Sequence, residues 1–495
     1  MARKFREITA GIILLMVFNI ASAQRSAIVL ENQKEGTTDW LITNVKKREC
    51  EYPDNQWCRR PAVEGYVSHQ SILAGEKLKI FVSTNPVSEF KMDIYRLGYY
   101  GGKGGRKMLS VGKLKGVTQA EPKPDPVTNL FECGWKESYS FTIPKDWMSG
   151  VYIGKITTLK DSSQTYVIFI VKDKRKVDFL FQCSDMTWLA YNRWPYWNSL
   201  YDLEHKAWNN KPGTIVSFNR PYGIFINNLP SDFNPYSLGA GEFLLWEYPL
   251  SYWMEKEGYD VSYISNTDTH ADGEGLNRAK GFLSVGHDEY WSQEMFDNLI
   301  KARDKGLNLL FFSGNSISGR LPLTPSVDGT PNKVMGPKTM FKNEEELMGS
   351  TSYGVGYAPF VCKVPDHWLF EGTGMKMNDT IPDLIGWEYH GYPLKNDPSL
   401  VVLATSDSFN ASCCHGDSRK PYAVTIYDGP KNNIVFNAAS CFWSMPLAKT
   451  PSYQNPVNNS GSLVYKEIDF AKGDERVRQM TKNLFKRVLK GGEKK

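Results

Sequence analysis

A change in hydrophobic pattern near residue 173 constrains the fold of this chain more than any other feature. Between about residues 27 and 171, short stretches of alternating apolar and polar residues are separated by Gly, Pro and Asp turns. This spacing is typical of a β-sandwich. After "KDKRK" (172–176) apolar strands are followed by helical patterns. We therefore expect an Ig-like β-sandwich domain over residues 24–173 and an α/β domain over residues 174–495.

The second half predicts a mainly parallel sheet. Five apolar stretches have the composition of strands: 177–182, 214–218, 259–265, 281–285 and 307–312. The clearest helix spans 293–305, where Ser292 can cap the start and Gly306 can end it. Its apolar residues share one face at helical spacing, namely Met295, Phe296, Leu299 and Ile300. A strand, a helix and a second strand in this order form a crossover, which makes neighbouring strands parallel.

The N-terminus has the pattern of a secretory signal peptide over residues 1–23. Three basic residues within the first six positions precede the apolar run 12–20, and "ASA" (21–23) ends it with small residues. The apolar run is too short to span a bilayer, and no later stretch is long and apolar enough to do so. We therefore expect cleavage after Ala23, a secreted or periplasmic protein, and no transmembrane segment.

Composition excludes some function classes. The 495 residues are 41% hydrophobic and 23% charged, as in an ordinary globular protein, and the net charge of +5 is spread thinly, so nothing indicates nucleic-acid binding. Export makes the eight cysteines candidates for disulfides. Cys50 and Cys58 close a short polar loop and are the best pair. For Cys413 and Cys414 we expect disulfides to distant cysteines, or buried thiols, rather than a zinc site.

Polar and aromatic loops follow all five expected strands of the second half. They read "CSDMTWLAYNRW", "NRPY", "NTDTH", "GHDEYW" and "SGNS". Because ligands bind beyond the carboxyl ends of parallel strands, these loops predict a site at one rim of the sheet. The candidate substrate-binding residues on them are Trp188, Tyr191, Asn192, Arg220 and Asn315.

Several chemistries remain open at this rim. No strained G-x-S-x-G turn is present, and "GYYGGKGGR" (98–106) resembles a hairpin turn rather than a phosphate-binding loop. Cys183 could act as a nucleophile with His287, although a cysteine after a buried strand is more often a core residue. A glycosidase could pair Asp288 or Glu289 with another carboxylate, for which the candidates are Asp185, Asp268 and Glu388. A metal site is the remaining option, since Tyr, His, Asp and Glu are all at hand.

Long motifs of this chain resemble the N,N-dimethylformamidase large (beta) subunit-like family. They are "VGHDEYWSQEMFDNLIKARDKGLNLLFFSGN" (285–315), "YRLGYYGGKGGR" (95–106), "SDMTWLAYNRW...SLYD" (184–202), "SFNRPY" (217–222), "EYPLSYWMEKEGYDV" (247–261) and "VRQMTKNLF" (477–485). The resemblance implies a flavodoxin- or glutamine-amidotransferase-like C-terminal α/β domain. It also implies a mononuclear ferric ion, Fe(III), held by two tyrosinates and a glutamate, which activates water against a tertiary amide.

Carried over by motif, the resemblance implies Tyr290, Tyr248 and Glu388 as metal ligands. Tyr252 is the rival of Tyr248, and Glu371 is the rival of Glu388. The candidate catalytic residues are His287, Asp288 and Glu289. Strand geometry puts Asp288 and Tyr290 on one side of the chain, so that Glu289 is expected to face away or to cap the helix. His287 is expected to be an acid–base group or to support the ligands.

Two function hypotheses follow. The first is an exported metal-dependent hydrolase that cleaves a carbon–nitrogen bond of an amide or formamide with metal-activated water. The alternative is an exported carbohydrate-active or glycan-binding protein that uses the aromatic loop 188–202 as a sugar platform. The expected ligand is accordingly a small amide or a glycan. A homo-oligomer or a small partner subunit is compatible with either hypothesis.

Overall fold

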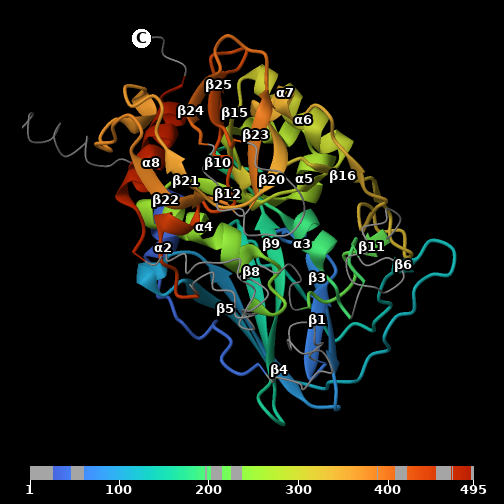
Figure 1. Cartoon of the computed structure of the whole chain (residues 1–495). Coiled ribbons are helices and arrows are strands. Elements are labelled where there is room, and N and C mark those ends of the chain that lie inside the picture. The colour runs from blue at the N-terminus through green and yellow to red at the C-terminus, as the bar shows by residue number, and fades with distance from the viewer. Residues whose placement is uncertain are drawn as a thin grey trace, which may run out of the picture.

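Two mainly antiparallel β-sheets come first along the chain (Figure 1). The computed structural model describes residues 26–45, 61–195, 198–201, 215–223, 237–386, 388–406, 421–452, 470 and 472–491. One sheet has the order β1-β3-β7 and the other β2-β9-β8-β4-β5. Their bounds are β1 (Val63–Val67), β2 (Ser71–Leu73), β3 (Lys77–Thr84), β4 (Phe90–Leu97), β5 (Gly105–Leu114), β7 (Tyr139–Thr142), β8 (Gly150–Thr158) and β9 (Gln164–Lys172). All these pairs are antiparallel except β2 with β9.

Strands β8 and β9 of the five-stranded sheet are buried on both faces. One face shares an apolar core with the three-stranded sheet, to which Met92 and Ile156 contribute. The other face, with Tyr95 and Ile153, belongs to the large core of the second half. Strands covered on both sides read as nearly continuous apolar runs, as β8 and β9 do. The β-sheets are therefore the packing partner of the α/β part as well as of each other.

A seven-stranded sheet forms the centre of the second half. Its order is β12-β10-β13-β15-β26-β25-β24. The bounds are β10 (Val177–Cys183), β12 (Val261–Ser265), β13 (Ala279–His287), β15 (Asn308–Gly314), β24 (Val401–Ala404), β25 (Val424–Asp428) and β26 (Ile434–Asn437). The first five strands in this order are parallel, and β25 and β24 are antiparallel. The expected mixed α/β architecture with a mainly parallel sheet is confirmed at this level.

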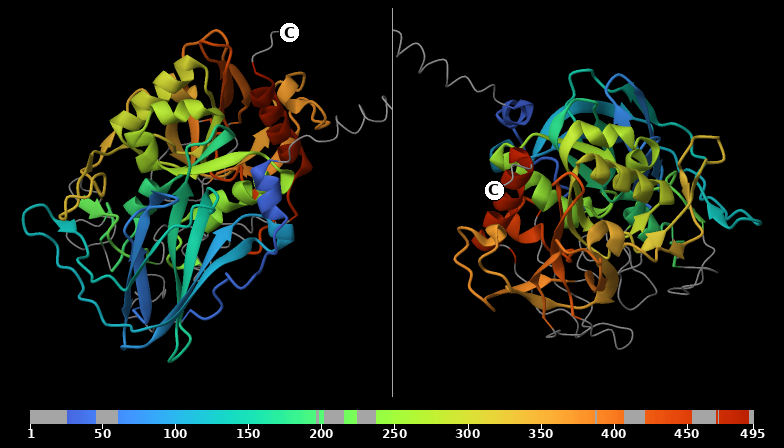
Figure 2. Two further views of the ribbon diagram at one scale, coloured as in Figure 1. Left: turned by 180° about the vertical axis from the view of Figure 1, so that it is seen from behind. Right: turned by 90° about the horizontal axis from the view of Figure 1, so that it is seen from above.

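Helices cover both faces of this sheet (Figure 2). On one face, α5 (Asn266–Ala271) contacts β10, where the Thr269 hydroxyl donates to Gln182 at 2.5 Å, and α6 (Gln293–Lys305) packs beside α5. On the other face, Phe485 of α8 (Glu475–Lys490) stacks near Phe179 of β10. The expected helix 293–305 is confirmed with its cap, since Ser292 Oγ accepts from the Met295 amide.

One expected strand lies elsewhere. Residues 214–218 were expected in the parallel sheet, but β11 (Ile215–Ser217) pairs with β6 (Leu130–Phe131) and β18 (Val334–Met335). These strands and β17 (Leu323–Thr324) form a separate four-stranded sheet. An apolar run of this length does not specify its partners, because pairing is decided by the tertiary packing around it.

Shorter elements complete the described fold. They are α2 (Ala27–Asn32), α3 (Asp185–Tyr191), α4 (Tyr248–Glu257), α7 (Glu345–Met348), β14 (Tyr290–Trp291), β16 (Gly319–Arg320), β19 (Thr339–Met340), β20 (Ser350–Val355), β21 (Ala358–Val361), β22 (Thr380–Ile385) and β23 (Glu388–Leu394), with a π-helical turn η5 (Phe243–Glu247) before α4. Single 3₁₀ turns are η1 (Tyr100–Gly102), η6 (Glu274–Arg278), η7 (Trp368–Phe370) and η8 (Met445–Leu447).

Two expectations from the sequence concern transmembrane segments and the pairing of the cysteines. Across the described ranges, no helix has both the length and the apolar character needed to cross a bilayer. The structure describes four cysteines, and all of them are buried: Cys133, Cys183, Cys362 and Cys441. Residues 1–23 and the cysteine pairs 50/58 and 413/414 lie outside the described residues.

Candidate functional site

The site lies at the carboxyl end of β13, the third strand of the seven-stranded sheet. His287 is the last residue of this strand and pairs with Gly314 of β15. Gly286 before it has a φ of +72°, and a Cβ there would lie 2.4 Å from the Cβ of Trp246. Only glycine fits this backbone conformation and this close approach to η5. The sequence therefore places an imidazole at the end of a buried parallel strand.

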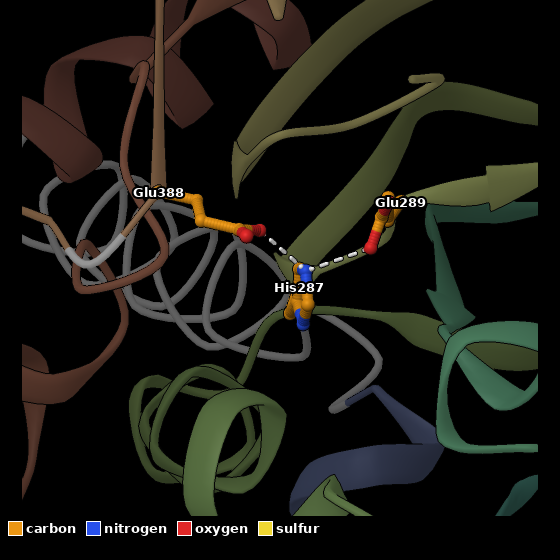
Figure 3. A group of neighbouring side chains, drawn as sticks. All are labelled: His287, Glu289 and Glu388. Carbon is orange, nitrogen blue, oxygen red and sulfur yellow. Dashed lines mark ion pairs between the residues drawn. The ribbon is translucent and has the colours of Figure 1, made fainter. Parts of the chain in front are cut away.

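Two carboxylates flank the His287 ring (Figure 3). Its Nε2 lies 2.7 Å from Glu388 Oε2 and 3.5 Å from Glu289 Oε2. Glu289 lies two residues after the end of β13, whereas Glu388 begins β23. The three residues are buried, and they offer ligand atoms that all lie within 4.8 Å of one another. Asn315 donates to Glu388 Oε2 at 2.9 Å and so fixes that carboxylate.

The ring nitrogens of His287 are not satisfied by these neighbours. Neither nitrogen makes a hydrogen bond to the described part of the chain, so the Glu388 oxygen lies off the N–H direction despite its short distance. A third carboxylate, Glu242, lies 3.6 Å from Nδ1. Burial alone would lower the pKa of His287, but Glu388, Glu242 and Glu289 raise it well above its ordinary value. Buried polar atoms without partners are rare, and they indicate that a ligand belongs here.

Glu289 is the centre of a cluster of phenols. The Tyr191 hydroxyl donates to Glu289 Oε2 at 2.5 Å, and the Tyr201 hydroxyl donates to Oε1 at 3.4 Å. The two hydroxyls are 3.1 Å apart. The Tyr290 hydroxyl contacts that of Tyr201. Lys338 donates from Nζ to Tyr290 at 3.0 Å, to Tyr201 at 3.1 Å and to Glu289 at 3.4 Å.

In this cluster the pKa of the carboxyl group is lowered, whereas the pKa values of the phenols are raised. Burial would raise the pKa of Glu289, but Lys338 and then His287 lower it to about 2. Burial and the Glu289 charge raise the pKa of Tyr201 to about 12 and those of Tyr191 and Tyr290 well above 10. These phenols are therefore neutral in the protein alone, and only a strongly charged cation beside them would favour phenolates.

The donor set fits the group that the resemblance implies. Two phenol oxygens and one carboxylate converge within hydrogen-bonding distance, as Tyr191, Tyr201 and Glu289. Phenolate and carboxylate oxygens are hard ligands that suit a highly charged cation such as Fe(III). A second, overlapping set is the imidazole and two carboxylates of His287, Glu289 and Glu388. Both sets share Glu289.

Tyr248 does not lie beside the cluster around Glu289. Its hydroxyl donates to the carbonyls of Gly104 at 2.6 Å and Gly98 at 3.2 Å, and its ring packs against Trp40. The expectation that Tyr248 is a ligand is therefore not carried into the proposal below, because its oxygen is committed to backbone carbonyls. Its rival Tyr252 packs edge-on against Tyr248 on α4.

Asp288 and Glu289 have exchanged the places expected for them. Asp288 faces inward beneath the site and accepts hydrogen bonds from Gln182, Ser284 and Asn266 at 2.7–2.9 Å. Burial raises the pKa of Asp288 to about 6. Glu289 faces the cluster, and Ser292 rather than Glu289 caps the helix. The alternation of side chains along a strand does not predict these directions, because β13 ends at His287 and Asp288 lies outside it.

The expected substrate-binding residues mostly hold the loop that carries the tyrosines. Arg220 donates to four backbone carbonyls, those of Leu189, Asn192, Trp194 and Asn198. Trp188 donates to Glu247 at 2.8 Å, and Asn192 donates to the Pro221 carbonyl. These side chains are buried, so Trp188 and Tyr191 do not form an exposed sugar platform. Burial also raises the pKa of Cys183 well above its ordinary value, which disfavours a reactive thiolate.

Three residues of the site were not singled out from the sequence. Tyr201 lies inside the "SLYD" motif (199–202), so the motif itself was a usable signal. Glu242 in "GAGEF" (239–243) and Lys338 in "GPKTM" (336–340) follow no pattern that indicates a site. Glu242 lies just before η5, and Lys338 lies just before β19. Only the tertiary fold places these two segments beside His287 and Glu289.

The comparisons with known proteins bear on this site. Residues 91–455 match the family model described as "N,N-dimethylformamidase beta subunit-like, C-terminal". The chain belongs to this family. The matched segment begins within β4, so it includes part of the β-sheets as well as the α/β part. The site residues at positions 191, 201, 242, 287, 289, 290, 338 and 388 all lie within it.

Other comparisons add little. The search of curated proteins found no match. Among solved structures, a family 123 glycoside hydrolase from Clostridium perfringens, studied for glycolipid glycan hydrolysis, aligns at 9% identity with a TM-score of 0.11. The alignment covers 58% of this chain and 54% of that one, so the chain spans about half of its length. A likeness this low carries no argument about fold or function.

Proposed function

We propose that this protein hydrolyses the carbon–nitrogen bond of a small amide of the formamide type with metal-activated water. The observation that carries the proposal is the position of Glu289. On one side it accepts from Tyr191 and Tyr201, and on the other it lies beside the His287–Glu388 pair. Family membership supports the same reaction class.

Glu289, Tyr191 and Tyr201 would hold the metal. This assignment keeps the ferric ion with two tyrosinates and one glutamate that the family resemblance implies. It replaces all three ligands expected from the sequence, which were Tyr290, Tyr248 and Glu388. A bound Fe(III) would polarise the amide carbonyl and lower the pKa of a bound water. The Tyr290 hydroxyl contacts that of Tyr201 and lies near Glu289, so in this assignment Tyr290 supports the pair of ligands.

The proton transfers would belong to Glu388 and His287. Glu388 can accept the proton that a water molecule loses as its oxygen adds to the carbonyl carbon. Asn315 holds the carboxylate for this task by its hydrogen bond to Oε2. His287 Nε2, 2.7 Å from Glu388, can deliver a proton to the nitrogen as the carbon–nitrogen bond breaks. The products are a carboxylic acid and an amine, and the burial of Glu388 and His287 limits competing bulk water.

The experiment is hydrolysis of N,N-dimethylformamide, measured as release of dimethylamine, with iron content determined on the same samples. Chelated protein should lose activity and regain it with iron. Tyr201→Phe should lose iron and activity, whereas Tyr248→Phe should keep both, since Tyr248 binds backbone carbonyls outside the cluster. Loss of iron in Tyr248→Phe but not in Tyr201→Phe would refute the ligand assignment.

A matched variant separates the two overlapping ligand sets. If the metal is held by Glu289 and the phenols, His287→Ala keeps stoichiometric iron and the absorption band of tyrosinate-to-iron charge transfer, while activity falls. If the metal is instead held by His287, Glu289 and Glu388, His287→Ala loses it and no such band exists in the wild type. If the iron-loaded protein hydrolyses neither tertiary nor secondary amides, the proposed reaction is wrong.

We further propose that the chain is exported and cleaved after Ala23, because residues 1–23 have the signal-peptide pattern. Edman sequencing of protein from its native host would contradict this if the chain still began at Met1. A small partner subunit or a homo-oligomer is also proposed, since the family is named after one subunit of an enzyme. Mass determination in solution, on protein isolated without a tag, tests it.

A further inference from the structure

Glu242 lies behind His287, on the side away from Glu388. It precedes the π-helical turn η5, and its side chain is completely buried. Within the ranges that the structure describes, neither of its oxygens has a hydrogen-bond partner. Burial raises the pKa of this carboxyl. A buried acid without a hydrogen bond is costly, so a role at the site is a better explanation for it than stability.

The backbone holds Glu242 in this place. The η5 turn packs closely on β13, since a Cβ at Gly286 would lie 2.4 Å from the Trp246 Cβ. The Ser444 hydroxyl donates to the Trp246 carbonyl and fixes the turn from its other side. Short π-helical turns often occur at functional sites, where they direct a side chain that a regular helix would not.

The two nitrogens of His287 face different carboxylates. Nδ1 lies 3.6 Å from Glu242 Oε2, while Nε2 lies 2.7 Å from Glu388 and 3.5 Å from Glu289. A carboxylate beside one ring nitrogen favours the tautomer that carries its proton there. The 3.6 Å separation exceeds a hydrogen bond, so Glu242 acts through its charge here; such contacts often shorten when substrate binds.

We infer that Glu242 is a positioning residue that keeps the Nδ1 proton of His287 and directs Nε2 toward Glu388 and Glu289. This inference rests on the proposed function only for its effect on catalysis. The orientation itself follows whether His287 transfers a proton or binds a metal through Nε2, because both roles need Nε2 free on the side of Glu289.

Glu247 provides the matched control. It ends the same η5 turn and is equally buried, but its oxygens accept from Trp188 Nε1 at 2.8 Å and from the Ser184 amide at 3.3 Å. Glu247→Gln therefore replaces a buried carboxyl group of the same turn without changing the surroundings of His287.

The experiment compares Glu242→Gln, Glu242→Leu and Glu247→Gln in the iron-loaded full chain. Glutamine keeps an acceptor for Nδ1–H, and leucine removes it. We expect kcat for N,N-dimethylformamide to fall about 10–100-fold in the Glu242 variants, more for Leu than for Gln, with KM and iron content nearly unchanged. The melting temperature should stay or rise, since an unpaired buried carboxylate is removed. A merely structural role would lower it.

A second readout does not need activity. In metal-free protein labelled with ¹⁵N-histidine, at a pH high enough for the His287 ring to be neutral, its signals should show the Nδ1–H tautomer in the wild type and a mixture in Glu242→Leu. Assignment uses His287→Gln. An unchanged tautomer in Glu242→Leu overturns the inference, as does a fall in kcat no larger than that of Glu247→Gln. If no amide is hydrolysed, the proposed function fails, and the tautomer alone decides the inference.

Discussion

Two buried groups of charged residues in this molecule are built in opposite ways. Where the five-stranded sheet meets α4, Arg96 and Glu255 form an ion pair with both side chains fully buried, at 2.8 and 2.9 Å. Arg96 also donates to Tyr100 and to the Ser149 carbonyl, and Glu255 also accepts from Tyr263. At the end of β13, the ring nitrogens of His287 and both oxygens of Glu242 lack such partners within the described structure.

The difference teaches how to tell a structural charge from a functional one. Both terminal NH₂ groups of Arg96 donate to Glu255, which leaves only Arg96 Nε without a partner in the described structure, and the pair joins β4 to α4 across the shared core. His287, by contrast, has three carboxylates around it but no hydrogen bond of good direction. Unsatisfied buried groups lower stability, so they persist where a ligand or a reaction needs them. Breaking each group should therefore have opposite consequences.

The largest expected effect is on catalysis. Glu388→Gln should lower kcat for N,N-dimethylformamide by roughly 10²–10⁴-fold, because an amide cannot accept the proton from water. The melting temperature should stay or rise, since three carboxylates crowd one imidazole here. Steady-state kinetics and calorimetry on the same preparation check both parts. A variant that is inactive because it melts earlier would place Glu388 with the structural charges.

The next effect is on stability. Arg96→Met leaves Glu255 buried without its partner, which should cost about 3–5 kcal/mol of unfolding free energy. Activity per folded molecule should remain, because this pair lies outside the cluster around Glu289. Urea unfolding measures the loss of unfolding free energy. The control compares activity with the fraction of folded protein in the same sample. A loss below about 1 kcal/mol would mean that the pair does not hold the two parts together.

A smaller effect is expected inside the site. Tyr290→Phe keeps the ring and its packing but removes the hydroxyl beside Tyr201 and Lys338. Iron affinity should fall about 10–100-fold, as for a residue that supports a ligand, and the tyrosinate band should shift rather than vanish. Competition with a chelator measures the affinity. Complete loss of the band would make Tyr290 itself a ligand, and unchanged affinity would leave it as packing.

The smallest effect concerns acid stability near the structural pair. Glu31 accepts from Lys34, Arg106 and Tyr100 at 2.6–2.9 Å. Burial would raise its pKa, but these partners and Arg96 lower it from 4.5 to about 2. The carboxylate therefore contributes stability that is complete above pH 4.5 and is lost as the pH falls toward 2. Glu31→Gln should cost about 1–2 kcal/mol at pH 7 and less at pH 2.5. An equal cost at both pH values would argue against this.

The fold was largely readable from the sequence where periodicity was long. Helix α6 has a serine cap, an apolar face and a final glycine, and it begins and ends where expected. Four of the five expected strands belong to the parallel sheet, but β11 does not, because three residues of strand cannot specify a partner. The domain boundary near residue 173 stays a prediction, and the core shared across it follows from side-chain packing that no pattern encodes.

The site was only partly readable. His287 and Glu388 were both named, and the structure brings them to 2.7 Å. Strand alternation pointed Asp288 rather than Glu289 into the site, because the sequence pattern does not show that the strand ends at His287. Tyr248 was predicted to be a ligand from its position in the motif, but its hydroxyl donates to the Gly104 carbonyl outside the site. Glu242 and Lys338 come from distant segments, and only tertiary structure shows that they converge.

The most direct test of the central claim is to locate the metal. A crystal of the iron-loaded protein, measured on both sides of the iron absorption edge, gives an anomalous difference map that shows iron alone. The account predicts one peak per chain, about 2.0–2.2 Å from oxygens of Glu289, Tyr191 and Tyr201, with His287 and Glu388 beside it. A peak bonded to His287 Nε2 and Glu388 without the phenols would contradict the assignment. The absence of any peak at Glu289 would contradict the metal centre itself.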